Sequence, residues 1–247
     1  MAEIFGGHLV AKYLKQVEHV GMVFTISGGH IENILDGFTQ YGIRTIDVRH
    51  EQAAAMMAHA WSIYTNEPGV CLVTAGPGFT NALTGIANAF LDNVPLVVLC
   101  GRHPLRDDLT GALQEMNQID MVKPVTKWCA TCYDAKRIPE YLSIAFRQAT
   151  MGRPGPVFLE LPPDILFVSV DEKAVNMPVR RVHKSSTHPD DTELKEAARI
   201  INSAERPLFM GGSGVRMSGC QDVLKTFMEK TGFPFALLNN GRGALPD

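Results

Sequence analysis

The chain has 247 residues, of which 45% are hydrophobic and 20% charged, and its formal net charge is −3. This length exceeds one average domain, and the composition supports a buried core and argues against wholesale disorder. The small negative charge, without a basic run or an aromatic-interleaved stripe, argues against a nucleic-acid-binding surface.

Targeting and redox signals are weak in this sequence. The N-terminus lacks a basic region followed by an apolar run, so no signal peptide is predicted. The most apolar region, residues 82–100, is interrupted by polar side chains and a proline, which excludes a membrane span. The pair Cys129 and Cys132 forms a lone CxxC, a weak zinc signal, and five irregularly spaced cysteines do not form a disulfide framework. We therefore expect a reduced, cytoplasmic protein without membrane contact.

Apolar periodicity predicts alternating helices and strands in the first two-thirds of the chain. In chain order these are a helix at 6–17, a strand at 20–26, a helix at 31–41, a strand at 44–48, a helix at 51–64, a strand at 69–74, a helix capped by Thr80 and reaching 92, strands at 96–100 and 125–128, a helix at 138–150 and a strand at 157–161. Alternation with mostly apolar strands predicts an α/β domain over residues 1–165, a parallel sheet with helices on both faces. The polar segment 101–123 is predicted to be a long functional or mobile loop.

The remaining chain predicts a linker and a second α/β unit. Residues 166–190 are polar and contain the basic run 180–186. After them, the pattern predicts a helix near 194–201, a strand at 207–210, a glycine loop at 211–214, a helix near 223–228 and a strand at 235–238. Two strands and two helices are a poor basis for an independent domain, so residues 191–247 are expected to be the start of an incomplete, Rossmann-like central domain.

Four segments of the first domain follow predicted strand ends. These are His30, Glu51, the turn Gly76–Gly78 and the loop 101–123. Open parallel sheets bind ligands at the carboxyl ends of their strands, so these segments are expected to converge on one ligand site.

Glu51 is the most informative of these residues. It lies at a strand-to-helix junction, in the first turn of an almost wholly apolar helix. If this carboxylate is buried, it either has hydrogen-bond partners or has a raised pKa suited to proton transfer. If it instead faces water, the helix dipole alone accounts for a glutamate at this position. His50-Glu51 resembles the start of a HExxH zinc helix, but Ala54 occupies the second ligand position and excludes that site.

The other candidates each allow a plain structural interpretation. The Gly76–Gly78 turn could bind an anion on free N–H groups, or it could be only a turn, since it lacks the lysine of a P-loop. His30 could donate to a substrate oxygen or be a solvated turn residue. Gln114 can both donate and accept. The loop Gly211–Gly214 is compatible with a nucleotide and equally with a tight turn.

An ordered series of motifs resembles the thiamine-diphosphate enzymes of the acetolactate synthase superfamily. The motifs are His50-Glu-Gln-Ala-Ala-Ala55, Pro68–Asn81, Asn88–Asp92 with Pro95–Val98, Leu113-Gln-Glu115, Pro124–Lys127, Gly152–Val157 and Leu161–Asp164. Within the superfamily, Gly29-His30, Arg106-Asp107-Asp108 and Lys127-Trp128 look most like benzaldehyde lyase, with 2-hydroxyacyl-CoA lyases and acetolactate synthases close behind.

The resemblance implies a C–C lyase or carboligase acting on 2-keto acids or 2-hydroxy ketones. It implies that Glu51 hydrogen-bonds N1′ of the cofactor's aminopyrimidine and so promotes removal of the C2 proton. It further implies that Pro77 and Asn81 lie near the pyrimidine, and that His30 and Gln114 hydrogen-bond the substrate oxygen or the intermediate.

The sequence also departs from the family pattern. In the family, a third domain with a Gly-Asp-Gly motif holds the diphosphate and Mg²⁺, and no Gly-Asp-Gly occurs here. The resemblance therefore implies no metal ligands in this chain, little activity of the chain alone, and self-association into dimers or tetramers. Whether the central domain binds FAD, ADP or neither stays open. So do two alternatives, a non-catalytic nucleotide-binding or regulatory module and a separate subunit that completes its site with another polypeptide.

Overall fold

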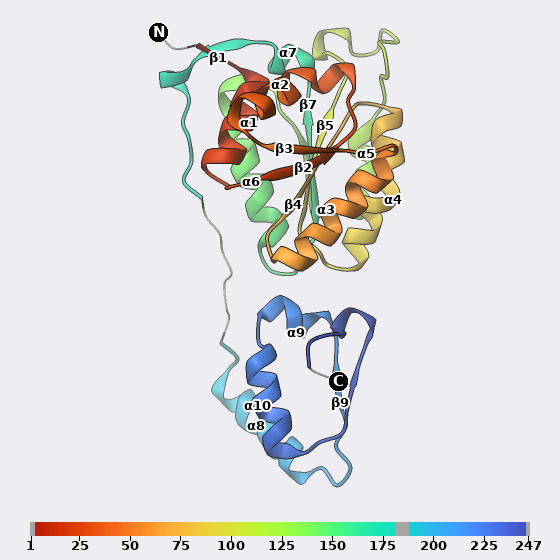
Figure 1. Cartoon of the computed structure of the whole chain (residues 1–247), viewed down its shortest axis with the longest axis vertical. Coiled ribbons are helices and arrows are strands. Elements are labelled where there is room, and N and C mark those ends of the chain that lie inside the picture. The colour runs from red at the N-terminus through yellow and green to blue at the C-terminus, as the bar shows by residue number, and fades with distance from the viewer. Residues whose placement is uncertain (1–2, 181–187, 246–247) are drawn as a thin grey trace. The chain divides into compact units, whose positions relative to one another are not determined.

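A computed structural model describes residues 3–180 and 188–245 (Figure 1). The chain divides into two compact units, Met1–Lys184 and Ser185–Asp247, which are described separately. Almost all of the basic run 180–186 lies outside the described residues. Among the helices of the described ranges, none is long and apolar enough to cross a membrane.

The first unit is built around a six-stranded parallel sheet. Its elements are β1 (Glu3–Phe5), α1 (Gly6–Gln16), β2 (Met22–Thr25), α2 (Glu32–Tyr41), β3 (Arg44–Asp47), α3 (Glu51–Thr65), β4 (Gly69–Val73), α4 (Pro77–Leu91), β5 (Leu96–Gly101), α5 (Gln118–Val122), β6 (Trp128–Thr131), α6 (Ile138–Thr150), β7 (Pro156–Leu161), α7 (Pro163–Leu166) and β8 (Ser169–Asp171). The sheet order is β3-β2-β4-β5-β7-β6, and every pair in it is parallel.

Helices cover both faces of this sheet, as predicted. Helices α1, α2 and α6 pack on one face, and α3 and α4 pack on the other (Figure 1). Side chains alternate between the two cores along a strand: Val97 and Leu99 of β5 belong to one, Val98 and Cys100 to the other. Full burial of one such aliphatic side chain stabilises the fold by about 1.5–3 kcal/mol. Both faces are apolar because both are covered.

The start of α4 differs from the prediction. The helix begins at Pro77 and not with Thr80 as its cap, so Gly76–Gly78 forms the cap and first turn. Proline suits the first helical position because its missing N–H has no partner there and its φ is already helical. Thr80 Oγ1 instead donates to the Pro77 carbonyl at 3.2 Å.

Two further boundaries in the middle of the domain are corrected. The predicted loop 101–123 ends in helix α5, which Asn117 caps by accepting from the Asp120 N–H at 3.3 Å. The strand predicted at 125–128 lies at Trp128–Thr131, because Lys123–Val125 forms a 3-10 turn around Pro124. A helix of five residues is too short to show apolar periodicity.

The first unit extends beyond residue 165, into the predicted linker 166–190. Strand β8 pairs antiparallel with β1, with Ile4 opposite Val170 in a two-stranded sheet. Both of these side chains are buried in the core of this unit. Strands of three residues are too short to show a periodic pattern, so their pairing could not be predicted from the sequence.

The second unit is small. It contains α8 (Asp191–Ser203), β9 (Phe209–Gly211), α9 (Ser213–Ser218), α10 (Gln221–Thr231) and β10 (Phe235–Leu237). Strands β9 and β10 are parallel, and the described buried core consists of Leu224, Met228 and Leu245. The predicted glycine loop 211–214 leads directly into α9, and no residue of α8 is buried.

Candidate active site

The carboxyl edge of the sheet brings the four predicted segments into contact. Glu51 follows β3 and is hydrogen-bonded by Asn81 of α4, which follows β4. His30 follows β2 and lies 3.3 Å from Thr74, also after β4. The loop after β5 contacts both the His30 segment and the segment that follows β4. The spatial convergence follows from the parallel strand order, which aligns all these strand ends at one edge.

Glu51 is the first residue of α3 and is half-buried. Its neighbour His50 caps the helix, with Nδ1 accepting the Gln52 N–H at 3.2 Å. Asn81 Nδ2 donates to Glu51 Oε2 at 2.9 Å. Oε1 accepts no hydrogen bond from the described residues, and a Cβ on Gly78 would lie only 3.4 Å from it. The carboxylate therefore presents an available oxygen beside the bare backbone of Gly78.

The first turn of α4 lies close to the end of β4. A Cβ on Gly78 would lie 2.7 Å from Thr74 Cγ2, so only glycine permits this approach. Pro77, in this first turn, and Asn81, one turn further along α4, are both exposed, and Asn81 donates a hydrogen bond to Glu51. The structure therefore brings Glu51 and Asn81 into direct contact and leaves Pro77 in the adjacent helical turn.

His30 is buried, which excludes the solvated-turn interpretation. Its side chain lies against Thr74, the Leu113 backbone and the Gln114 side chain. Desolvation lowers the pKa of His30, and the charge of His103 acts in the same direction, while hydrogen bonding to Leu113 and Gln114 partly opposes the shift. Burial therefore favours the neutral imidazole, which can donate one N–H.

Gln114 lies in the loop after β5 and packs against the start of α4. It has a left-handed backbone with φ +59°, a conformation that costs an ordinary residue about 1–2 kcal/mol. A Cβ on Gly76 would lie 2.9 Å from Gln114 Cβ, so glycine is needed at this contact. Gln114 thus lies against both His30 and the Gly76 turn.

Glu115 holds the loop that carries Gln114. Its carboxylate accepts the N–H groups of Leu109 at 2.5 Å, Gly111 at 2.8 Å and Ala112 at 3.0 Å. These hydrogen bonds, led by that from Leu109, lower the pKa of Glu115. Leu109 has a positive φ of 64°, a strained conformation for a residue other than glycine, and the Glu115 carboxylate holds its N–H in place.

His103, Asp108 and Glu115 have ligand atoms within 4.8 Å of one another, a spacing compatible with a metal ion. Their present contacts give them another role. Arg102 donates to Asp108 Oδ1 at 2.6 Å, and His103 Nε2 lies 2.5 Å from the same oxygen. Because Arg102 already supplies positive charge and Glu115 binds three amides, we assign this cluster to loop structure.

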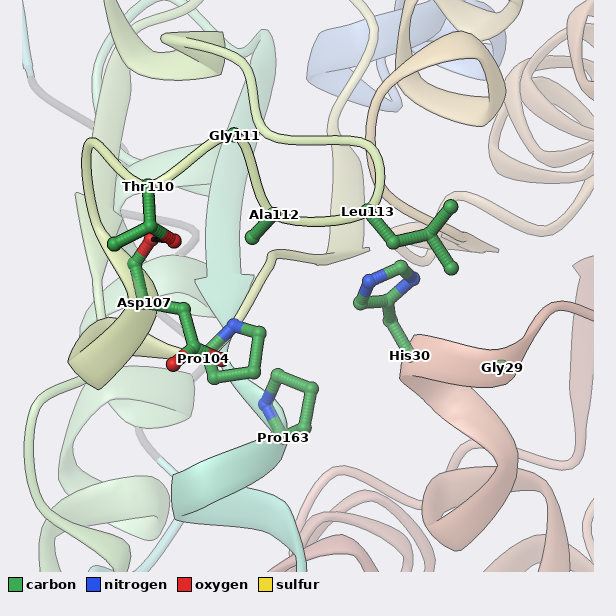
Figure 2. A pocket seen from close by; sticks show the side chains of 9 residues that line it. All are labelled: Gly29, His30, Pro104, Asp107, Thr110, Gly111, Ala112, Leu113 and Pro163. Carbon is green, nitrogen blue, oxygen red and sulfur yellow. Dashed lines mark hydrogen bonds between the residues drawn. The ribbon is translucent and has the colours of Figure 1, made fainter.

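A cavity of about 540 Å³ opens beside His30. His30 and Leu113 lie on one side of it, and Pro104, Asp107 and Thr110 lie on the other (Figure 2). Most of the residues that line it are apolar or uncharged. The other lining residues are Gly29, Gly111, Ala112 and Pro163. The cavity has the size and composition of a small-molecule site.

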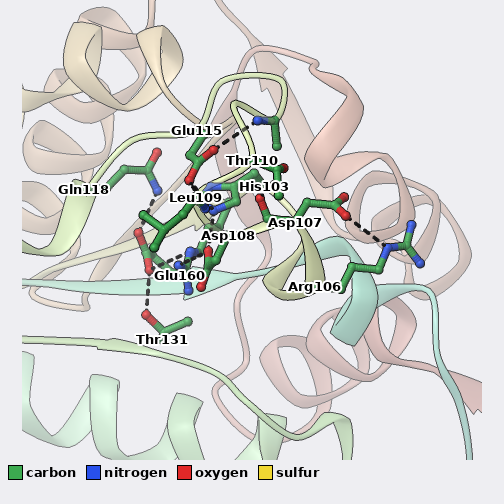
Figure 3. Close-up of polar contacts among 12 residues, drawn as sticks. His103, Arg106, Asp107, Asp108, Leu109, Thr110, Glu115, Gln118, Thr131 and Glu160 are labelled. Carbon is green, nitrogen blue, oxygen red and sulfur yellow. Dashed lines mark hydrogen bonds and ion pairs between the residues drawn. The ribbon is translucent and has the colours of Figure 1, made fainter.

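Sequence reasoning missed a buried polar network behind the site (Figure 3). Glu160 of β7 accepts from Thr131 Oγ1 at 2.6 Å and from Gln118 Nε2 at 2.8 Å. Gln118 Oε1 accepts the Gly76 N–H at 2.8 Å. A signal was present, because Glu160 interrupts the otherwise apolar strand 157–161 and a charged residue there needs partners.

Two family models match the chain. Residues 4–121 match "Thiamine pyrophosphate enzyme, N-terminal TPP binding domain", and residues 194–247 match "Thiamine pyrophosphate enzyme, central domain".

Curated relatives agree with the family models. The chain is 35% identical over 240 residues to an acetolactate synthase large subunit of Mycobacterium tuberculosis, covering 97% of this chain and 44% of that protein. It is 34% identical over 251 residues to a 2-hydroxyacyl-CoA lyase of Arabidopsis thaliana, covering 99% and 43%. It is 37% identical over 254 residues to acetolactate synthase isozyme 3 large subunit of Escherichia coli, covering 100% and 43%. The chain spans less than half the length of these relatives, and it belongs to the thiamine pyrophosphate enzyme family.

Proposed function

We propose that this chain supplies the cofactor-activating glutamate of a thiamine-diphosphate-dependent enzyme that cleaves or forms C–C bonds in 2-keto acids or 2-hydroxy ketones. The observation that carries the proposal is the Glu51 carboxylate, held by Asn81 through Oε2 and leaving Oε1 available beside Gly78. The family assignment supports the cofactor, and the position of Glu51 supports its part in this proposal.

The residues present fit the aminopyrimidine end of the cofactor. A ring nitrogen of the cofactor needs a carboxylate oxygen within reach. Glu51 is half-buried and its Oε1 has no partner among the described residues, so this oxygen is available to a ligand. When bound, thiamine diphosphate supplies an acidic C2–H and an electron sink for breaking a bond next to a carbonyl carbon.

Each residue has a distinct part in this proposal. Glu51 exchanges a proton with N1′ of the aminopyrimidine, and the Asn81 hydrogen bond fixes the direction of its carboxylate. His30, uncharged because it is buried, donates to a substrate oxygen, and Gln114 orients His30 and contacts the same oxygen. Pro77 shapes the turn beside the ring through its fixed φ.

The cavity beside His30 suits a small carbonyl substrate. Its volume of about 540 Å³ and its mostly uncharged lining favour an aldehyde, a ketone or the apolar part of a 2-keto acid. A carbonyl compound bound in this cavity would have its oxygen within reach of the His30 imidazole, which lines the cavity (Figure 2).

The complete site requires more than this chain's described residues. We infer that the diphosphate and Mg²⁺ are held by a part of the enzyme that corresponds to the remaining length of the relatives. The charged cluster of His103, Asp108 and Glu115 is a poor substitute, because its oxygens already bind Arg102 and backbone amides.

We also infer that the enzyme self-associates through α3. This helix exposes four large apolar side chains, Met56, Met57, Trp61 and Tyr64, and the spacing of Met57, Trp61 and Tyr64 puts these three on one side of the helix. An exposed apolar patch on a helix is typical of an association surface. Glu51 begins the same helix, so a second subunit on this face would approach the cofactor site.

Turnover by the native-length protein tests the proposal. With thiamine diphosphate and Mg²⁺ present, we expect conversion of a 2-keto acid or a 2-hydroxy ketone, and we expect Glu51→Gln to lower kcat by about 100-fold or more. Glu32→Gln is the matched control, because Glu32 is the exposed first residue of α2 and its side chain has no hydrogen bond or ion pair with any described residue of the site. Full activity of Glu51→Gln, or no cofactor-dependent turnover of either substrate class, would refute the proposed function.

A further inference from the structure

Glu160 is a buried carboxylate that the proposed chemistry does not use. It is 2% exposed and lies in a strand whose other residues are apolar. Burial of a carboxylate is costly unless partners replace its water. Here Thr131 and Gln118 donate to its two oxygens, and Arg102 Nε lies 3.9 Å away (Figure 3). A buried charge at this position therefore organises its neighbours.

Gln118 links Glu160 to the cofactor turn. It is 1% exposed, and its Nε2 donates to Glu160 at 2.8 Å and to the Gly101 carbonyl at 3.1 Å. Both of these partners are acceptors, so the amide nitrogen must face them. The amide oxygen is thereby directed at the Gly76 N–H, which it accepts at 2.8 Å. Glu160 thus dictates which way Gln118 faces, and Gln118 anchors Gly76.

Gly76 determines where the first turn of α4 lies. Its backbone has φ +61° and ψ −115°, outside the conformations that hold a helix by themselves. A shift of this residue would move Gly78 and Asn81 relative to Glu51, and it would loosen the contact with Gln114. Misplacement of a catalytic group by about 1 Å can slow a reaction about 100-fold.

We propose that Glu160 and Gln118 form a positioning pair, which holds the Gly76 turn so that Asn81 and Gly78 face Glu51. The proposal rests on the proposed function, because it concerns the placement of the groups that activate the cofactor. Neither residue touches the reacting atoms.

Three variants separate positioning from plain stability. Gln118→Met keeps the side-chain length and removes every hydrogen bond. Gln118→Glu keeps an acceptor for Gly76 but sets a second carboxylate against Glu160. The exchange Gln118→Glu with Glu160→Gln keeps the acceptor for Gly76 and restores a donor between the two side chains, but it loses the bond to Gly101 and the charge that faces Arg102 at position 160. Tyr13→Phe is the matched control, because it removes another buried hydrogen bond to a carboxylate, that of Tyr13 to Glu18 at 3.0 Å.

Two readouts are measured. The first is hydrogen exchange of the Gly76 amide, followed by NMR in the cofactor-free chain. The second is deuterium exchange at C2 of thiamine diphosphate, at saturating cofactor, in the native-length protein. We expect Gln118→Met to speed Gly76 exchange about tenfold or more and to slow C2 exchange about tenfold or more. We expect the double exchange to recover most of the C2 rate lost in Gln118→Glu, and Tyr13→Phe to alter neither readout.

The opposite results overturn the proposal. Unchanged Gly76 exchange in Gln118→Met would show that the hydrogen bond does not hold the turn. Unchanged C2 exchange, or an equal loss in Tyr13→Phe, would show a merely structural role. If Gln118→Met fails to fold, the C2 exchange rates of Gln118→Glu and of the double exchange are compared instead. A double exchange that does not recover the rate lost in Gln118→Glu would contradict a positioning role. Absence of any C2 exchange in the wild-type protein would instead refute the proposed function, and Gly76 exchange would still decide whether Gln118 holds the turn.

Discussion

At the scale of single residues, burial determines the charge of the imidazole at the site. His30 is 7% exposed, and loss of water around it lowers its pKa below the ordinary value. Hydrogen bonding to Leu113 and Gln114 opposes this effect but does not reverse it. An imidazole that stays neutral donates one hydrogen bond without adding a positive charge beside the cofactor.

This pKa shift predicts a specific pH dependence of stability. The folded chain binds the His30 proton less tightly than the unfolded chain, so the unfolded chain takes up more protons as the pH falls. The contribution to stability is present above the unfolded pKa of about 6.5 and is lost as the pH falls through the lower folded pKa. We expect His30→Gln to flatten this part of the curve of unfolding free energy against pH, measured by urea denaturation.

The exposed Gln40 of α2 provides the control for this measurement, because its side chain carries no ionisable group. We expect Gln40→Asn to keep the wild-type slope. A His30→Gln variant whose stability depends on pH as steeply as that of the wild type would show that His30 is not held neutral by burial.

The sequence predicted some residues of the site better than others. Glu51 and His30 follow strand ends, so their convergence follows from the fold class alone. The role of Asn81 came only through the family resemblance, although the hydrogen bond to Glu51 gives it a physical basis. Gln118 was not predicted, because the groups that its side chain contacts, among them Gly76, Gly101 and Glu160, are distant in sequence.

At the scale of elements, long periodic segments were predicted well and short ones were not. Helix α6 lies at Ile138–Thr150, as its pattern predicts, because an amphipathic helix of that length must bury one face. The start of α4 and the pairing of β8 with β1 were missed. The start of α4 depends on the position of one proline, and the pairing of β8 with β1 depends on three residues in each strand. Neither feature produces a repeating pattern in the sequence.

The exposed face of α3 leads to a prediction about assembly. Met57 and Tyr64 are seven residues apart and so lie on one side of the helix, both exposed. We expect Met57→Asp to weaken self-association of the native-length protein about tenfold or more, because it places a charge in an apolar interface. Sedimentation equilibrium measures the dissociation constant.

Tyr133→Asp is the control for assembly, since Tyr133 is exposed but lies outside α3. It should leave the dissociation constant unchanged. A monomeric wild-type protein, or equal association of the wild type and Met57→Asp, would remove α3 as the association surface.

At the scale of the whole molecule, the two units differ in how much core they contain. The first unit has two large apolar clusters, one on each face of its sheet, whereas the described apolar cluster of the second unit has only three buried residues. The family models follow the same division, with one match in each unit. The chain covers 43–44% of the three relatives compared here, and the proposed chemistry therefore belongs to the assembled enzyme.

Deuterium exchange at C2 of bound thiamine diphosphate tests the central claim most directly, because it reports proton activation without requiring the correct substrate. In the native-length protein, Glu51 should accelerate this exchange well above the rate of free cofactor, and Glu51→Gln should return it to within about tenfold of the free rate while Glu32→Gln keeps the wild-type rate. Equal exchange rates in the wild type and Glu51→Gln, with the cofactor bound in both, would contradict the account.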